Sequence, residues 1–115
     1  MALVPRVLEA RGLDVTPQMI ARLRSVGDDR TADILELILR EEVAHVAAGT
    51  RWFHWCCAQA GVDPEPTFAS LLDAHAPHAV RAPLNAPARR AAGFSASEMD
   101  DLQRRATLRQ PTPIR

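Results

Sequence analysis

The chain has 115 residues, of which 47% are hydrophobic, so it is long enough for one domain with an apolar core. Its formal net charge is zero, which gives no general attraction to nucleic acid or to an anionic membrane. Residues 1–75 hold 7 Arg against 11 acids, whereas residues 76–115 hold 7 Arg against 3 acids. We therefore expect the basic C-terminal part to pack near the acidic part, with a phosphate-bearing partner as the weaker alternative.

The first predicted element is an apolar helix over residues 2–11. We expect it to end at Gly12, because Gly is a common helix stop. The helix opens on apolar residues with no capping side chain, so it looks cut from a longer helix. Thr16 then predicts an N-cap and Pro17 a first helical position, which favours a second, short helix over residues 17–26.

The longest predicted element is a helix that begins after Asp28 or Asp29 and continues to about residue 60. Gly61 is its predicted stop. At 1.5 Å per residue, such a helix is roughly 45 Å long.

Beyond a Pro-rich turn, the chain predicts shorter elements. They are helices over residues 67–75 and 95–106, a short helical turn over residues 85–93, and a loose tail over residues 110–115. Asn85 is the predicted cap of the turn, and Ser95 with Glu98 has the spacing of a capping box. No strand pattern or repeat is visible, so the sequence predicts an all-α fold.

Glu42-x-x-His45 is the pattern in the long helix that indicates chemistry. The two residues lie about 60° apart on one helix face. The residues around them on that face are apolar: Ile34, Leu35, Ile38, Val46, Gly49, Trp52, Phe53 and Cys56. A carboxylate there costs several kcal/mol unless a cation neutralises it. Four-helix carboxylate proteins use this spacing for iron or manganese. The alternative is a core histidine beside a glutamate paired with an Arg such as Arg11.

Glu9 is the third candidate ligand. It lies on the first helix, and four-helix carboxylate sites take a single Glu from one helix and Glu-x-x-His from the next. The alternative is a solvated helical glutamate. We interpret the other histidines as surface or packing residues; they are His54, His75 and His78. We interpret Trp52 and Trp55 as core anchors.

The sequence favours a reducing, bacterial-type cytoplasm. Cys56 and Cys57 are neighbours in a predicted helix, where an ordinary disulfide does not form. No signal-peptide pattern is visible, and no apolar run reaches the length that spans a bilayer. We therefore expect no membrane partner.

Four segments together resemble a known family. They are Val7–Pro17 (VLEARGLDVTP), Arg40–Val46 (REEVAHV), Gly49–Phe53 (GTRWF) and Ala88–Phe94 (ARRAAGF). They resemble DUF455, a bacterial family of unknown function in the ferritin-like superfamily that is distantly similar to the tRNA-hydroxylase di-iron family. The resemblance implies the C-terminal half of a ferritin-like four-helix bundle plus short C-terminal helices. Residues 1–62 would be the third and fourth bundle helices, and residues 63–115 a C-terminal helical extension and tail.

The resemblance also implies a site and a reaction class. Glu9, Glu42 and His45 would be ligands of a di-iron or di-manganese centre for oxygen-dependent oxidation or hydroxylation. Family members are longer, and their first half supplies a further Glu helix and a further Glu-x-x-His helix that this chain lacks. These three residues therefore do not close a two-metal site by themselves.

Two arrangements would complete such a site. A homodimer would bring both copies of the three ligands around a two-fold axis. Alternatively, the chain is truncated or half of a split protein and needs a missing N-terminal half, which is the arrangement that the sequence favours. The rival class is a metal-free helical structural or interaction domain.

Overall fold

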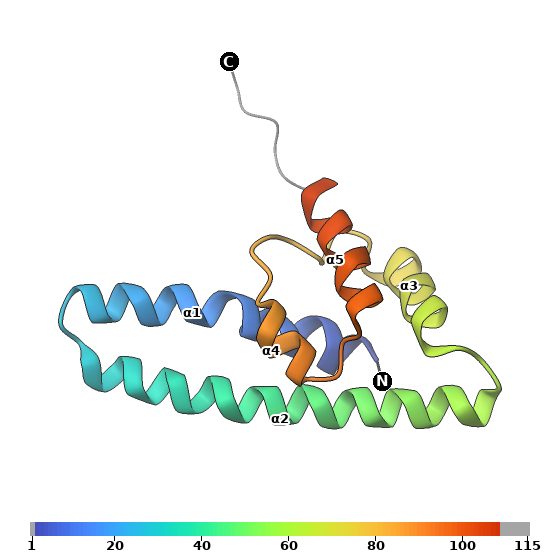
Figure 1. Ribbon diagram of the computed structural model, residues 1–115, viewed down its shortest axis with the longest axis horizontal. Coiled ribbons are helices and arrows are strands. Elements are labelled where there is room, and N and C mark those ends of the chain that lie inside the picture. Colours follow the sequence, from blue (N-terminus) through green and yellow to red (C-terminus); the bar gives the residue numbers. More distant parts are fainter. Residues whose placement is uncertain (1, 109–115) are drawn as a thin grey trace, which may run out of the picture.

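The computed structural model describes residues 2–108, which are mainly helical and contain no strand (Figure 1). The helices, in chain order, are η1 (Val4–Glu9), α1 (Ala10–Ser25), α2 (Asp29–Ala60), α3 (Pro64–His75), α4 (Ala86–Ala91) and α5 (Ala96–Leu108). The all-α class is thus confirmed for these residues. The predicted tail over residues 110–115 lies outside the described part of the chain.

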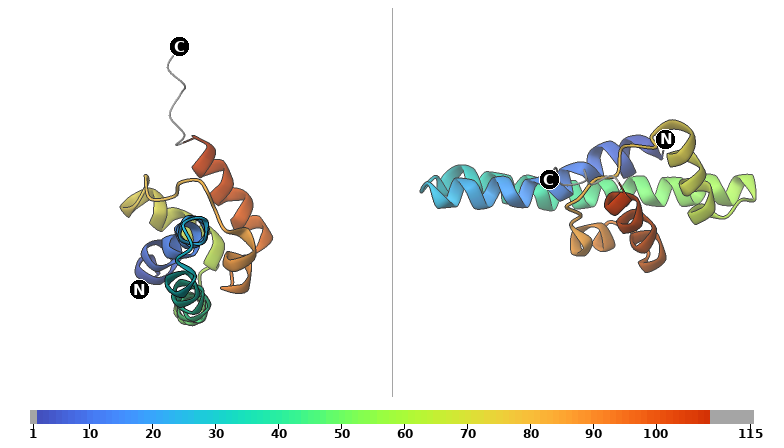
Figure 2. Two further views of the ribbon diagram at one scale, coloured as in Figure 1. Left: turned by 90° about the vertical axis from the view of Figure 1, so that its left-hand side faces the viewer. Right: turned by 90° about the horizontal axis from the view of Figure 1, so that it is seen from above.

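The hairpin of α1 and α2 is the frame of the molecule. The π-helix η1 continues directly into α1, and this arm lies antiparallel to α2 (Figure 1). Helices α4 and α5 lie on one side of the hairpin, and α3 follows the C-terminal end of α2 (Figure 2). Large buried apolar side chains come from α1, α2, α3, α5 and the turn before α5: Leu13, Val46, Phe53, Phe68, Leu72, Phe94 and Leu102. No helix within residues 2–108 combines the length and the apolar character needed to cross a bilayer.

The predicted break at Gly12 is wrong, because α1 passes through this position and through Pro17. The Thr16 hydroxyl does not cap a helix; it donates to the Gly12 carbonyl oxygen at 2.6 Å. Pro17 has no N–H for the carbonyl of Leu13, four residues earlier. The side-chain amide of Asn85 donates to that oxygen instead, at 3.0 Å. A residue from the far end of the chain thereby allows the helix to continue.

The caps of the long helix agree with the sequence prediction. The Asp28 carboxylate accepts a hydrogen bond from the Thr31 N–H at 3.2 Å. Gly61 ends the helix at φ 68°, a left-handed conformation that Gly adopts without steric cost.

The predicted C-terminal caps are also confirmed. The Asn85 side chain accepts from the Ala88 N–H at 3.3 Å and opens α4. Before α5, the Ser95 N–H donates to Glu98 and the Glu98 N–H donates to the Ser95 hydroxyl, both at 3.1 Å. This reciprocal pair is the capping box that the residue spacing predicts.

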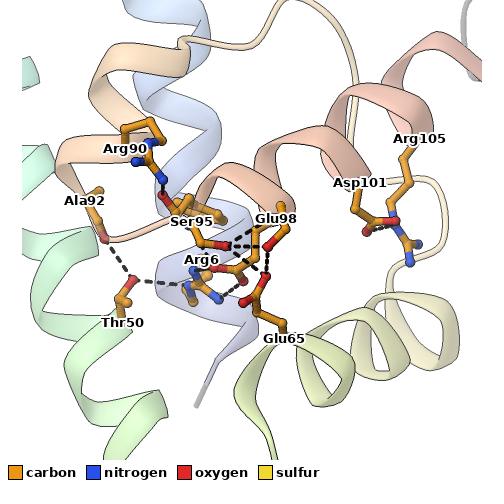
Figure 3. A network of polar contacts seen from close by, with 11 residues as sticks. Arg6, Thr50, Glu65, Arg90, Ala92, Ser95, Glu98, Asp101 and Arg105 are labelled. Carbon is orange, nitrogen blue, oxygen red and sulfur yellow. Dashed lines mark hydrogen bonds and ion pairs between the residues drawn. The ribbon is translucent and has the colours of Figure 1, made fainter.

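Arg6 on η1 ties the arm to α5 through a buried ion pair (Figure 3). It is 1% exposed and donates to both Glu98 oxygens, at 2.8 and 3.1 Å. Its Nε donates to the Thr50 hydroxyl of α2 at 3.1 Å, and that hydroxyl donates to the Ala92 carbonyl at 2.9 Å. One guanidinium therefore links three segments that are far apart in the sequence.

Three aromatic rings enclose the same guanidinium. The Cζ atom of Arg6 lies 4.1 Å from the ring centroid of Phe94, 4.5 Å from that of Phe68 and 5.7 Å from that of Phe53. The rings exclude water and interact with the cation through their faces. Burial of this charge is tolerable only because Glu98 and the rings offset its desolvation.

A second buried pair joins α1 to α4. Arg89 donates to the two oxygens of Asp14 at 2.9 and 2.5 Å, and the Asn85 N–H donates to Asp14 at 2.8 Å. The Asp14 side chain is fully buried. The expectation that the basic C-terminal part packs on the acidic helical part is confirmed at this contact.

We predict that Glu98→Ala destabilises the fold by about 3–5 kcal/mol, because it leaves the Arg6 cation buried without its partner. Urea unfolding followed by circular dichroism measures this change. The control is Arg104→Ala, which removes an exposed ion pair with Asp101 and leaves the midpoint unchanged. Equal effects of the two substitutions would contradict the role given to the buried pair.

A pair of identical substitutions tests the contact between the arm and α2. A Cβ at Gly49 would overlap the ring of Pro5, whereas a Cβ at Gly12 would meet no atom within 4 Å. Gly12→Ala should stabilise the protein by about 0.5–1 kcal/mol through helix propensity. Gly49→Ala should destabilise it by about 1–3 kcal/mol, because the arm must shift. Thermal unfolding of both variants measures the opposite signs, and a stabilising Gly49→Ala would disprove the close contact.

Candidate functional site

Glu42 and His45 lie together in the middle of α2. The Nδ1 atom of His45 is 3.5 Å from Oε2 of Glu42. The Glu42 side chain is 25% exposed and that of His45 is 64% exposed. The carboxylate is therefore mostly covered by protein, whereas the imidazole faces solvent.

One oxygen of Glu42 is buried without a hydrogen-bond partner. Its Oε1 atom is fully covered, and no donor within residues 2–108 reaches it. A carboxylate oxygen accepts up to two hydrogen bonds, and leaving a buried acceptor unsatisfied costs about 1–3 kcal/mol. Glu42 is thus a covered acceptor that a donor or a cation would stabilise.

Glu9 is half-buried and is the last residue of the π-helix η1. The π-helical turn ends at Ala10, whose N–H donates to the carbonyl oxygens of Pro5 and Val7. Single π-helical turns are rare and are found frequently at functional sites. Glu9 lies at the junction of η1 and α1, and its role as a ligand stays a prediction.

The structure brings Glu42 and His45 together, but it does not join Glu9 to them in a larger cluster. Within residues 2–108, no group of three or more His, Cys, Asp and Glu side chains is arranged to hold a metal ion. The ligand set of Glu9, Glu42 and His45 therefore stays a prediction.

The alternative pairing of Glu42 with Arg11 is wrong. The Arg11 guanidinium donates to the carbonyl oxygens of Arg81 and Pro83, at 2.6 and 3.4 Å, and lies 3.5 Å from Asp14. This side chain secures the segment before α4, so it is directed away from Glu42.

The apolar face predicted around Glu42 is divided between core and surface. Val46 and Phe53 are buried in the core. Ile34, Ile38 and Trp52 are 51%, 48% and 58% exposed, because the other described helices pack on a different face of α2.

The interpretation of the two tryptophans as core anchors is also wrong. Trp52 and Trp55 are 58% and 56% exposed, and their rings contact each other edge to face at 5.9 Å. Residue type and helical spacing suggested that these apolar side chains are buried. They could not show that no described helix covers them.

The remaining polar candidates are mostly as interpreted. His54, His75 and His78 are exposed. Cys56 and Cys57 are both free thiols, and burial raises the pKa of Cys57, which disfavours its reactive thiolate. No feature of these residues adds to the site.

Residues that the sequence interpretation missed are the buried charges. Arg6 pairs with Glu98, and Asp14 pairs with Arg89, across more than 70 positions of sequence. Near the first pair, hydrogen bonds from Ser97 and Ser95 hold the pKa of Glu65 below its usual value. Asp14 and Arg89 both lie in segments that resemble the family, which was a signal that these residues matter. Spacing along the chain could not show that they pair with each other.

We predict that Glu42→Leu stabilises the metal-free protein by about 1 kcal/mol, because the substitution removes an unsatisfied buried oxygen. Urea unfolding in the presence of a chelator measures this effect. Glu36→Leu is the control on an exposed face of α2; it removes an exposed ion pair with Arg24 and should give no such gain. A destabilising Glu42→Leu would mean that the carboxylate already has a partner in the folded protein.

Comparison with known proteins found a matching family and a related protein. The sequence model of a family described as protein of unknown function (DUF455) matches residues 1–100. An uncharacterized protein of Haemophilus influenzae is 41% identical over 100 residues, which are 87% of this chain and 35% of that protein. The chain thus spans about a third of the length of this relative. No solved structure matches the chain.

Proposed function

The chain belongs to the DUF455 family, and we propose that it contributes to a carboxylate–histidine metal centre that holds iron or manganese. Glu42 and His45 are the proposed ligands on α2, and Glu9 is the proposed ligand on the arm. The reaction class proposed for the completed centre is oxygen-dependent oxidation or hydroxylation. Because the relative is much longer, this activity is proposed for a centre that this chain supplies only in part.

The unsatisfied Oε1 of Glu42 is the observation that carries the proposal. A buried carboxylate oxygen with no donor has the chemistry of a metal ligand. The neighbouring imidazole nitrogen at 3.5 Å adds a second donor type on the same side of the helix. Mixed carboxylate and imidazole ligands suit Fe²⁺ and Mn²⁺.

The protein residues have distinct tasks in this proposal. Glu42 is mostly covered by protein, so its carboxylate would bind the ion from within the fold. His45 lies one turn further along and is exposed, so it can bind an ion shared with a further protein surface. When bound, the metal would supply the redox chemistry with oxygen.

The proposal predicts a specific loss of metal binding. Anaerobic titration of the chelator-treated protein with Mn²⁺, followed by electron paramagnetic resonance, measures the affinity. Glu42→Gln and His45→Asn should each weaken binding by at least about tenfold, the loss that even removal of a ligand-orienting residue typically causes.

The controls are Glu36→Gln and His54→Asn, which alter exposed residues of α2. They should leave the Mn²⁺ affinity unchanged. Absence of Mn²⁺ binding, or equal losses in the control variants, would favour the metal-free helical domain.

A further inference from the structure

Helix α2 carries a stripe of mainly apolar residues that no described helix covers. Its members follow one another at alternating spacings of four and three residues: Ile34, Ile38, Glu41, His45, Ala48, Trp52 and Trp55. They fall within about 100° of the helix circumference and span about 32 Å of its length. This is the spacing of helices that pair along a seam. We call this stripe the α2 seam.

The exposure of the seam marks it as an interaction surface. Its four large apolar residues are between 48% and 58% exposed. At the C-terminal end, Ala48, Arg51, Trp52 and Trp55 line an open groove of about 500 Å³. Exposed apolar side chains grouped in this way are found at sites of protein association.

The charge of α2 is divided along its length. Residues 29–42 carry five acids and two Arg, whereas residues 43–60 carry no acid and contain Arg51, His45 and His54. An identical helix placed antiparallel brings each acidic half beside the half that has no acid. A parallel arrangement would place the two acidic halves together, where they repel.

We propose that the α2 seam binds a second copy of this chain in an antiparallel, two-fold arrangement. One register pairs every seam position between Ile34 and Trp52. It places Glu41 opposite His45 of the second copy and Ile34 opposite Trp52 of the second copy. The same register sets Ile38 against Ala48 of the second copy, so a large side chain meets a small one.

This register also concerns the proposed metal centre. The two-fold axis passes α2 between Glu41 and His45, so Glu42 and His45 of both copies lie within about 3 Å of it along the helix. The seam therefore supplies a second carboxylate and imidazole to the same region. This step rests on the proposed function, whereas the pairing of the helices does not need a metal.

Disulfide cross-linking tests the register. The background is Cys56→Ser with Cys57→Ala, because both native thiols are free. Adding Ile38→Cys and Ala48→Cys should give a covalent dimer on mild oxidation, since the paired positions come within disulfide range. Replacing Ala48→Cys by Ala58→Cys moves the exposed partner thiol about 15 Å along the helix and should abolish the cross-link.

Sedimentation in the presence of chelator tests the association itself. The unaltered chain should sediment as a dimer, and Trp52→Glu should convert it to a folded monomer, because Trp52 is already exposed in the single chain. Val26→Glu, at a 78% exposed position outside the seam, should remain a dimer.

Several outcomes overturn the proposal. One is a monomer that forms a complex with the unmatched part of the Haemophilus protein, which would assign the seam to a different helical segment. A dimer unaffected by Trp52→Glu, or cross-linked only through Ala58→Cys, also overturns it. Because sedimentation is done without metal, failure to bind Mn²⁺ would defeat the proposed function while leaving the dimer intact.

Discussion

The burial of the Arg6 guanidinium is the constraint on which the rest of the structure depends. A cation removed from water requires a carboxylate, further acceptors and close-packed rings, and each comes from a different part of the chain. Glu98 comes from α5, Thr50 and Phe53 from α2, and Phe68 from α3. Satisfying this one charge therefore holds α3 and α5 on the hairpin.

The sequence predicted those features that depend on neighbouring residues. The capping box of Ser95 and Glu98 and the stop at Gly61 were predictable because their contacts span a few positions. The break at Gly12 was wrong because the acceptor freed by Pro17 is satisfied from 72 positions away. Local rules describe which groups need a partner, but only the tertiary fold shows where the partner comes from.

The same division applies to the candidate site. Glu42 and His45 share one helix turn, so their proximity could be predicted from their spacing. Whether Glu9 lies near them depends on how η1 packs against α2, which spacing does not give. Helical periodicity also identified the apolar residues of α2 without showing which are covered. The exposed tryptophans lie on the uncovered side of α2, whereas the unsatisfied Glu42 oxygen is covered by protein.

The bond from the Asn85 side chain to the Leu13 carbonyl has a consequence for how the protein opens. The Asn85 amide replaces a backbone hydrogen bond that α1 lacks at Pro17. If the segment that contains Asn85 detached, the Leu13 carbonyl inside the arm would be left unsatisfied. Fraying near α4 would then spread into the first turns of α1. Slow hydrogen exchange in these two distant stretches should rise and fall together, as in a single cooperative unit.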